Sequence, residues 1–161
     1  MLSRTRVAAV ALAVVSSAVV IGGIAEASSP GLTAPETMVV TVRGGTSSFV
    51  NNAGSSNGFD PGDMLILTQP AYRGTGTTRI GTGFVTLVAT GADSAQLHAS
   101  LKLNGGDIEL GGIQPPANGP FTLAVTGGTG AFQNARGQAI VNVAQGNADP
   151  SPARITLTLL P

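Results

Sequence analysis

Apolar and polar residues alternate with a period of two along most of this chain, and this pattern constrains its fold more than any other feature. Residues 96–103, for example, place apolar side chains at the odd positions and polar side chains at the even ones. Such alternation is typical of β-strands whose two faces meet different surroundings. No stretch after residue 27 keeps helical spacing over three turns. The pattern therefore predicts an all-β domain.

The alternating segments predict about eight antiparallel strands. These segments are 36–43, 63–69, 79–90, 95–103, 107–112, 120–126, 136–144 and 153–160. Eight antiparallel strands can close into a barrel, which removes exposed sheet edges and leaves room for one small ligand. The same periodicity also fits a sandwich of two sheets, which is the main alternative.

Short turn signals separate the predicted strands. Asn-Gly pairs at 57–58, 104–105 and 118–119 favour the type I′ turn that joins adjacent antiparallel strands, and Gly146–Pro152 reads as a longer loop. The segment from Gly44 to Gly58 is rich in Gly, Ser and Asn and is too polar for a core. We expect it to form a long mobile loop over one end of the barrel.

The N-terminus has the parts of a secretory signal peptide. A basic start precedes a long apolar run that ends in the small-x-small triplet at 25–27. We therefore expect cleavage of a signal peptide over 1–27 and secretion, with a flexible leader at 28–35 and the barrel over 36–161. A retained membrane anchor is the alternative, because the apolar run is nearly long enough to span a bilayer.

Composition excludes several classes of function. The sequence contains no cysteine, which rules out disulfides, thiolate chemistry and cysteine-ligated metals. After the predicted cleavage site, six basic residues face seven acidic ones. A net charge near −1 without a basic cluster argues against a nucleic-acid partner, whose binding requires many neutralised phosphates.

A Gly-Gly-Thr-Gly cluster at 127–130 stands between two alternating segments. A dinucleotide-binding loop requires G-x-G-x-x-G followed by a helix, and here neither that spacing nor a helical pattern is present. We predict instead that these glycines supply the positive-φ geometry of a turn.

Two segments, in this order, carry a resemblance to a known superfamily. The first runs over 62–83 and includes the stretch Gln-Pro-Ala-Tyr-Arg-Gly at 69–74. The second runs over 123–138 and contains the glycine cluster, Phe132 and the Ala-Arg-Gly triplet at 135–137. Together they resemble the allene oxide cyclase and dirigent barrel superfamily. The resemblance implies an eight-stranded antiparallel β-barrel, usually oligomeric, that guides reactive organic intermediates without a cofactor; related bacterial barrels catalyse cyclisations in polyketide pathways, [4+2] reactions included.

The same resemblance implies positions for site residues. Gln69 takes the place of the lumen asparagine that holds a water against the epoxide in allene oxide cyclases. Their glutamate and tyrosine correspond to 38–43 and 100–103, which contain no carboxylate and no aromatic residue. The aspartate of dirigent proteins corresponds to 43–45, where the sequence reads Arg-Gly-Gly.

Asp63, Gln69 and Tyr72 are the candidate catalytic residues. Asp63 shares a strand face with Gln69 and could act as an acid in the barrel lumen, or it could bind backbone amides at the start of its strand. Tyr72, the only tyrosine, could orient a carbonyl or protonate an enolate. Its alternative role is packing at the rim of the barrel.

A group of polar residues on two neighbouring strands has a simpler explanation. If this hairpin turns at its Asn-Gly pair, Lys102 lies opposite Asp107 and Ser100 lies opposite Glu109. An ordinary cross-strand ion pair accounts for these residues. The single histidine, His98, lies on the same face and is a weak basis for a metal site without clustered carboxylates. No serine stands in a nucleophile elbow.

The sequence thus leaves two functions open. The first is a secreted, cofactor-independent barrel that binds an apolar unsaturated small molecule and steers its cyclisation as an isomerase or cyclase, with Asp63, Gln69 and Tyr72 as polar anchors. The second is a non-catalytic barrel that binds a small ligand, or a dirigent-like barrel; the missing family carboxylate and tyrosine favour it. Either protein could be a homo-oligomer.

Overall fold

The computed structural model describes residues 34–52, 54, 59–91, 94–115, 119–146 and 148–160. The predicted signal peptide and nearly all of the predicted leader lie outside these residues, as do the turn at 57–58 and Asn118 of the turn at 118–119. Secretion and signal-peptide cleavage therefore stay predictions. Within the described ranges, no helix has both the length and the hydropathy needed to cross a membrane.

The described residues form nine strands and one short 3₁₀ helix. They are β1 (Glu36–Val42), β2 (Thr46–Val50), β3 (Met64–Arg73), β4 (Arg79–Gly91), β5 (Ser94–Leu103), β6 (Gly106–Gln114), β7 (Phe121–Gly128), η1 (Gly130–Phe132), β8 (Arg136–Val143) and β9 (Ala153–Leu160). Each of the eight predicted strands is present, with ends that differ by a few residues. The Asn-Gly turn at 104–105 joins β5 to β6 as expected, because Leu103 pairs with Gly106.

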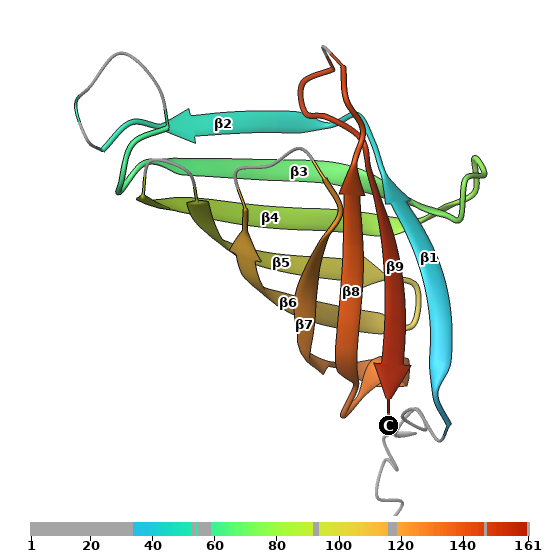
Figure 1. Ribbon diagram of the computed structural model, residues 1–161. Helices are drawn as coiled ribbons and strands as arrows, with labels where there is room; N and C mark the ends of the chain where they lie inside the picture. The colour runs from blue at the N-terminus through green and yellow to red at the C-terminus, as the bar shows by residue number, and fades with distance from the viewer. Residues whose placement is uncertain are drawn as a thin grey trace, which may run out of the picture.

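The strands close into an antiparallel barrel (Figure 1). Neighbours run in the order β1-β9-β8-β7-β6-β5-β4-β3, and β1 returns to β3 through the pairs Val40 with Arg73 and Val42 with Ala71. The predicted eight-stranded barrel is confirmed, and the alternative sandwich of two sheets is wrong. A single curved sheet has enough strands here to bury its inner face by closing on itself.

The strand β2 corrects the prediction of a loop between Gly44 and Gly58. Residues Thr46–Val50 pair with the first half of β3, from Thr46 opposite Thr68 to Val50 opposite Met64. All five side chains of β2 are exposed, so the segment shows no alternation that could reveal a strand. It extends the wall of the barrel beyond the point where β1 leaves β3 (Figure 1).

Positive φ explains only one of the three glycines in the Gly-Gly-Thr-Gly cluster at 127–130. Gly130 has a φ of +58°, but Gly127 and Gly128 are outside that region and belong to β7. At Gly128 the constraint is space, since a Cβ atom would lie 2.3 Å from the backbone oxygen of Phe132. The prediction that the cluster is structural agrees with this packing, while the prediction of positive φ is wrong for Gly127 and Gly128.

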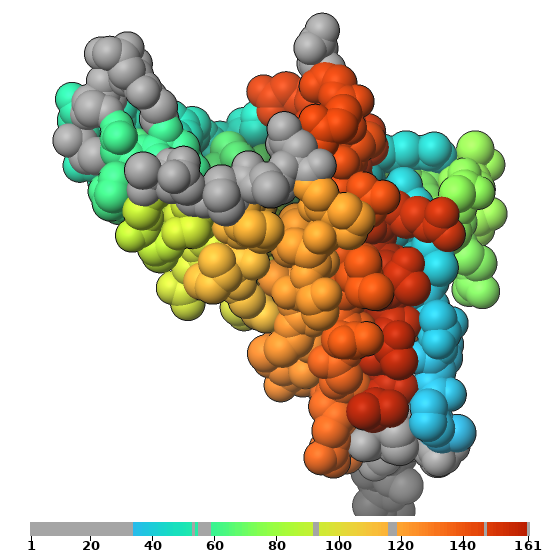
Figure 2. Space-filling model, in the orientation of Figure 1, coloured from blue at the N-terminus to red at the C-terminus, as the bar shows by residue number. Residues whose placement is uncertain are grey.

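The interior of the barrel is closely packed around η1 and the end of β9, which we call the filled end. Near η1 and the end of β9, Ile108, Leu157 and Leu159 are completely buried, and Phe132 of η1 packs against the same core. The molecule is broad at the opposite end, which carries β2 and the β8–β9 loop, and it narrows toward the end of β9 (Figure 2). An apolar cavity lies inside the broad end, which we call the hollow end.

Candidate functional site

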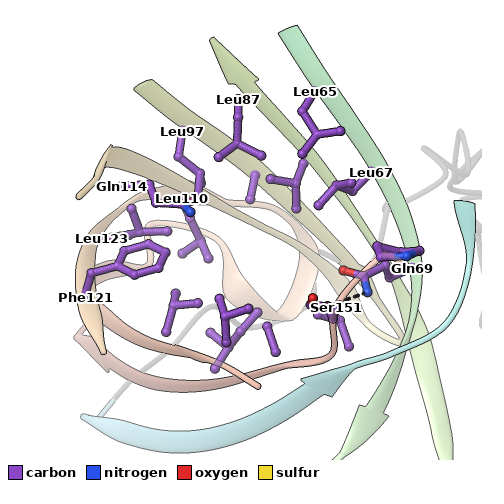
Figure 3. Close-up of a pocket in the computed structure, with 18 of the residues that line it drawn as sticks. Leu65, Leu67, Gln69, Leu87, Leu97, Leu110, Gln114, Phe121, Leu123 and Ser151 are labelled. Carbon is purple, nitrogen blue, oxygen red and sulfur yellow. Dashed lines mark hydrogen bonds between the residues drawn. The ribbon is translucent and has the colours of Figure 1, made fainter. Parts of the chain in front are cut away.

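A cavity of about 320 Å³ lies inside the broad end of the barrel. All eight barrel strands contribute inward-facing side chains to its wall. The larger apolar ones include Leu65, Leu67, Leu87, Leu97, Leu110, Leu123 and Phe121 (Figure 3). Small-molecule pockets typically have volumes of about 300–1,000 Å³ and predominantly apolar walls. The cavity has the size and chemistry to hold one small apolar molecule.

The alternation along the strands explains why this wall is apolar. On β3, Leu65, Leu67 and Gln69 face inward, and they pair across the sheet with Leu87, Val85 and Gly83 of β4. Side chains directly opposite on adjacent strands lie on the same face. The inward faces of neighbouring strands thus meet as one continuous apolar surface.

Gln69 is the buried polar side chain of this wall. It is 3% exposed, and its Nε2 donates a hydrogen bond of 3.2 Å to the carbonyl oxygen of Ser151. Ser151 belongs to the loop between β8 and β9, so this contact joins the wall of the cavity to its cover (Figure 3). The structure places Gln69 in the lumen of the barrel, as the sequence predicted.

The β8–β9 loop covers part of the cavity mouth. Ala148, Asp149, Pro150 and Ser151 all line the cavity, and the hydrogen bond from Ala144 N to the carbonyl oxygen of Pro152, 2.8 Å long, closes the base of the loop. The sequence showed this segment as a loop but carried no sign that it folds over the barrel. Such a contact depends on the closure of strands that are distant along the chain.

Two polar groups at the mouth were not among the predicted site residues. Gln114, the last residue of β6, lines the cavity and is partly exposed, and Asp149 lines it from the loop and is exposed. Figure 3 shows Gln114 and Gln69 on opposite sides of the cavity. Continuing the alternation of β6 beyond residue 112 would have placed Gln114 on the inner face, since it has the same parity as Leu110.

Asp63 lies outside the set of residues that line the cavity. Its side chain is completely buried, with Oδ1 accepting from Asn52 N at 2.7 Å and Oδ2 accepting from Asp60 N at 3.0 Å. This is the backbone-binding role given above as the alternative for Asp63. The carboxylate fixes the segment that leads from β2 back to β3.

Tyr72 also lies away from the cavity lining. It is partly buried and pairs with Thr41 of β1, on the strand face opposite to that of the buried Ala71. The guanidinium carbon of Arg43 lies 4.4 Å from the centre of its ring. This geometry matches packing on the outer wall, and the structure therefore brings neither Asp63 nor Tyr72 to Gln69. Their catalytic roles stay predictions.

The predicted register of the polar residues on β5 and β6 is confirmed, but the predicted ion pair between Lys102 and Asp107 does not form; both residues are among those that the structure describes. Ser100 lies opposite Glu109 and Lys102 lies opposite Asp107. The hydroxyl of Ser100 donates to Oε2 of Glu109 at 2.6 Å, and Nε2 of His98 is 3.6 Å from the same oxygen. In the part of the chain that the structure describes, no three His, Asp or Glu side chains gather in a way that could hold a metal ion.

Comparisons with known proteins match the fold of this chain but not its sequence. No protein-family model matches, and no curated protein does either. Among solved structures, a pyocyanin demethylase shares 21% identity with a TM-score of 0.63, over 76% of this chain and 100% of that one. A pterocarpan synthase dirigent protein shares 15% identity with a TM-score of 0.60, over 78% of this chain and 91% of its own.

Cyclase barrels appear among the matches as well. A heme-binding cyclase that catalyses a [4+2] cycloaddition in neoabyssomicin biosynthesis shares 15% identity with a TM-score of 0.58, over 79% of this chain and 67% of that one. A Diels Alderase from Streptomyces koyangensis shares 15% identity with a TM-score of 0.56, over 79% and 69%. At these identities the likeness shows the fold alone. This chain has the barrel fold of dirigent proteins and [4+2] cyclases.

Proposed function

We propose that this protein binds one apolar, unsaturated small molecule in its barrel cavity and steers the cyclisation of that molecule without a cofactor. The observation that carries the proposal is the cavity of about 320 Å³, with Gln69 as the one buried polar side chain among the described residues of its wall. An apolar wall of this kind suits a ligand that carries few polar groups.

Confinement is the physical basis of the proposed catalysis. A flexible polyene or epoxide loses most of its conformers when it enters a rigid chamber, and the reacting atoms stay close together. Holding reactants in a near-attack geometry can contribute about 7–11 kcal/mol in the best intramolecular cases. Such a mechanism requires shape from the wall and few ionisable groups, which is what this cavity offers.

The structural relatives support the proposal by their chemistry. Two are named for [4+2] or Diels–Alder cyclisation and one for pterocarpan synthesis. We extend to this chain only the general mode of action, a barrel that guides a reactive organic intermediate, as allene oxide cyclases also do. We further propose that the protein acts outside the cell after removal of residues 1–27.

A non-catalytic carrier of a small ligand is the second candidate function. Among the described residues of the cavity wall, Asp149 is the one ionisable side chain, and it is exposed at the mouth. A reaction that depends on an acid or base deep in the lumen therefore has no described group to perform it. Binding without chemistry requires only the apolar wall.

Product analysis separates the two functions. Purified protein is incubated with a set of conjugated polyenes and fatty-acid allene oxides, and ring-closed products are measured by chiral chromatography with mass spectrometry. The cyclase proposal predicts that ring closure is faster than in buffer, or that it gives an excess of one enantiomer. Ala99→Phe, which fills the cavity, should abolish it, whereas Ala124→Phe on the exposed face of β7 should not. Saturable binding with racemic, uncatalysed closure would support the carrier.

A further inference from the structure

The hydrogen bond between Gln69 and the β8–β9 loop fixes the orientation of the Gln69 amide. A backbone carbonyl oxygen only accepts hydrogen bonds, so the group that faces Ser151 must be the amide nitrogen. Nε2 indeed lies 3.2 Å from that oxygen. The amide oxygen is then directed away from the loop, and Figure 3 shows it on the side of the amide that faces the apolar side chains of the cavity.

The carbonyl that orients Gln69 is itself held in place. The hydroxyl of Ser151 donates to the carbonyl oxygen of Ala148 at 3.1 Å. Its neighbour Pro150 is buried, and the carbonyl oxygen of Pro152 accepts from Ala144 N. The loop therefore presents the Ser151 carbonyl from a position fixed on both sides, and the amide cannot turn over without losing that bond.

The amide oxygen of Gln69 remains available inside the cavity. Among the described residues, the hydrogen bond to Ser151 is the one that this side chain makes. Among the described residues that are not exposed, every side-chain oxygen that is fully buried has a hydrogen-bond partner. Oε1 of Gln69 has no such partner, so it cannot be fully buried. Oε1 is therefore accessible, and since Gln69 is 3% exposed and lines the cavity, the access is from the cavity.

We propose that the cavity selects apolar molecules that carry a hydroxyl group, as an alcohol, phenol or enol, which donates a hydrogen bond to Oε1 of Gln69. This inference rests on the proposed function and narrows its ligand class. A molecule that fills the cavity without a donor leaves this acceptor buried and unpaired, which costs free energy. A ketone, ether or epoxide of the same skeleton has no hydrogen to donate to Oε1. It could only accept a hydrogen bond from Nε2, either in place of the Ser151 carbonyl or from the second hydrogen of Nε2.

Three naphthalene derivatives test the proposal because they differ mainly in one polar group. 2-Naphthol is a donor, 2-methoxynaphthalene has no donor, and 2-acetonaphthone offers only an acceptor. Their dissociation constants are measured by fluorescence titration against the wild-type protein and Gln69→Met, which keeps the length of the side chain but not the amide. Gln138→Met is the matched control, because it makes the same change on the exposed outer face of β8, away from the cavity lining.

We expect the wild type and Gln138→Met to bind 2-naphthol about tenfold more tightly than 2-methoxynaphthalene. A tenfold difference in dissociation constant is roughly the contribution of one buried hydrogen bond. Gln69→Met should bring that ratio close to one. An unchanged ratio in Gln69→Met overturns the inference but leaves the binding function intact. If none of the three compounds binds the wild type, the proposed function fails instead. Tighter binding of 2-acetonaphthone than of 2-naphthol by the wild type overturns the inference without any variant.

Discussion

At the scale of single residues, two buried polar side chains have different surroundings. Asp63 and Gln69 are the buried polar residues of the described chain. Both carboxylate oxygens of Asp63 accept backbone N–H groups, so its polarity stabilises a chain segment. The amide of Gln69 makes one bond to the loop and keeps its oxygen toward the cavity. The two buried polar side chains thus differ in one respect: only Gln69 keeps a polar atom toward the cavity.

Replacement of Asp63 by asparagine should lower stability without affecting the cavity. A carboxamide has one acceptor oxygen where the carboxylate has two, so Asp63→Asn places an NH₂ group against a backbone N–H. We expect a loss of about 1–3 kcal/mol in the free energy of unfolding, measured by urea denaturation. Asp149→Asn, at an exposed position, should change little. A folded Asp63→Asn protein with normal stability but lost turnover would show instead that Asp63 is catalytic.

The adjacent glycines of the cluster offer a matched test of close packing. A Cβ atom on Gly128 would lie 2.3 Å from the carbonyl oxygen of Phe132, whereas one on Gly127 would meet no atom within 4 Å. Gly128→Ala should therefore cost about 1–3 kcal/mol in the free energy of unfolding. Gly127→Ala should be neutral or slightly stabilising. Equal effects in thermal denaturation would contradict the packing explanation.

At the scale of elements, most strands could be predicted because the inner and outer faces of the barrel have different surroundings. A strand such as β5 alternates because one face meets the core and the other meets solvent. Alternation does not reveal β2, because all of its side chains are exposed. The prediction ended β3 at residue 69, just before Pro70, which is typical of a strand end. The strand in fact continues through Pro70 to Arg73. The carbonyl oxygen of Pro70 still accepts a hydrogen bond from Arg43 N.

The site was less predictable than the fold. Alternation along β3 placed Gln69 on the inner face, and the resemblance gave it a function. The contribution of Ser151 could not be predicted, because a loop position over the mouth depends on non-local closure of the barrel. Asp63 has the same parity as Gln69, but it precedes the first residue of β3, where alternation no longer determines direction.

The pairing of β2 depends on a glycine between β1 and β2. Gly45 has a φ of +102°, and a Cβ atom there would lie 2.0 Å from the carbonyl oxygen of Thr68. Gly45→Ala should separate β2 from β3 and remove hydrogen-exchange protection from residues 46–50. Gly44→Ala is the control, because φ is also positive there but no atom lies within 4 Å of the added Cβ. Retained protection in Gly45→Ala would contradict this account of the β1–β2 connection.

At the scale of the whole molecule, the barrel divides into a filled end and a hollow end. Stability should come mainly from the filled end, where side chains are surrounded on all sides. The proposed ligand binding uses the hollow end, where side chains have no partner across the cavity. Dispersion contacts are lost wherever one side of a side chain faces empty space. The two ends should therefore respond differently to the same substitution.

Leucine-to-alanine substitutions at the two ends test this division. Leu157 is completely buried in the filled end, whereas Leu87 is nearly buried but lines the cavity. Leu157→Ala should lower the free energy of unfolding by about 3–5 kcal/mol, and Leu87→Ala by less, about 1–3 kcal/mol. Denaturant titration of both variants provides the comparison. Similar losses at both positions would mean that the broad end is packed as tightly as the narrow one.

We propose that the cavity of the broad end holds one small apolar molecule, and the stoichiometry of ligand binding tests this proposal without reference to catalysis. Calorimetric titration with 2-naphthol should give saturable binding of one molecule per chain. This binding should be lost in Ala99→Phe, which fills the chamber, and kept in Ala124→Phe on the outer face. Binding that does not saturate, or that is equal in the two variants, would mean that the ligand does not bind inside the barrel.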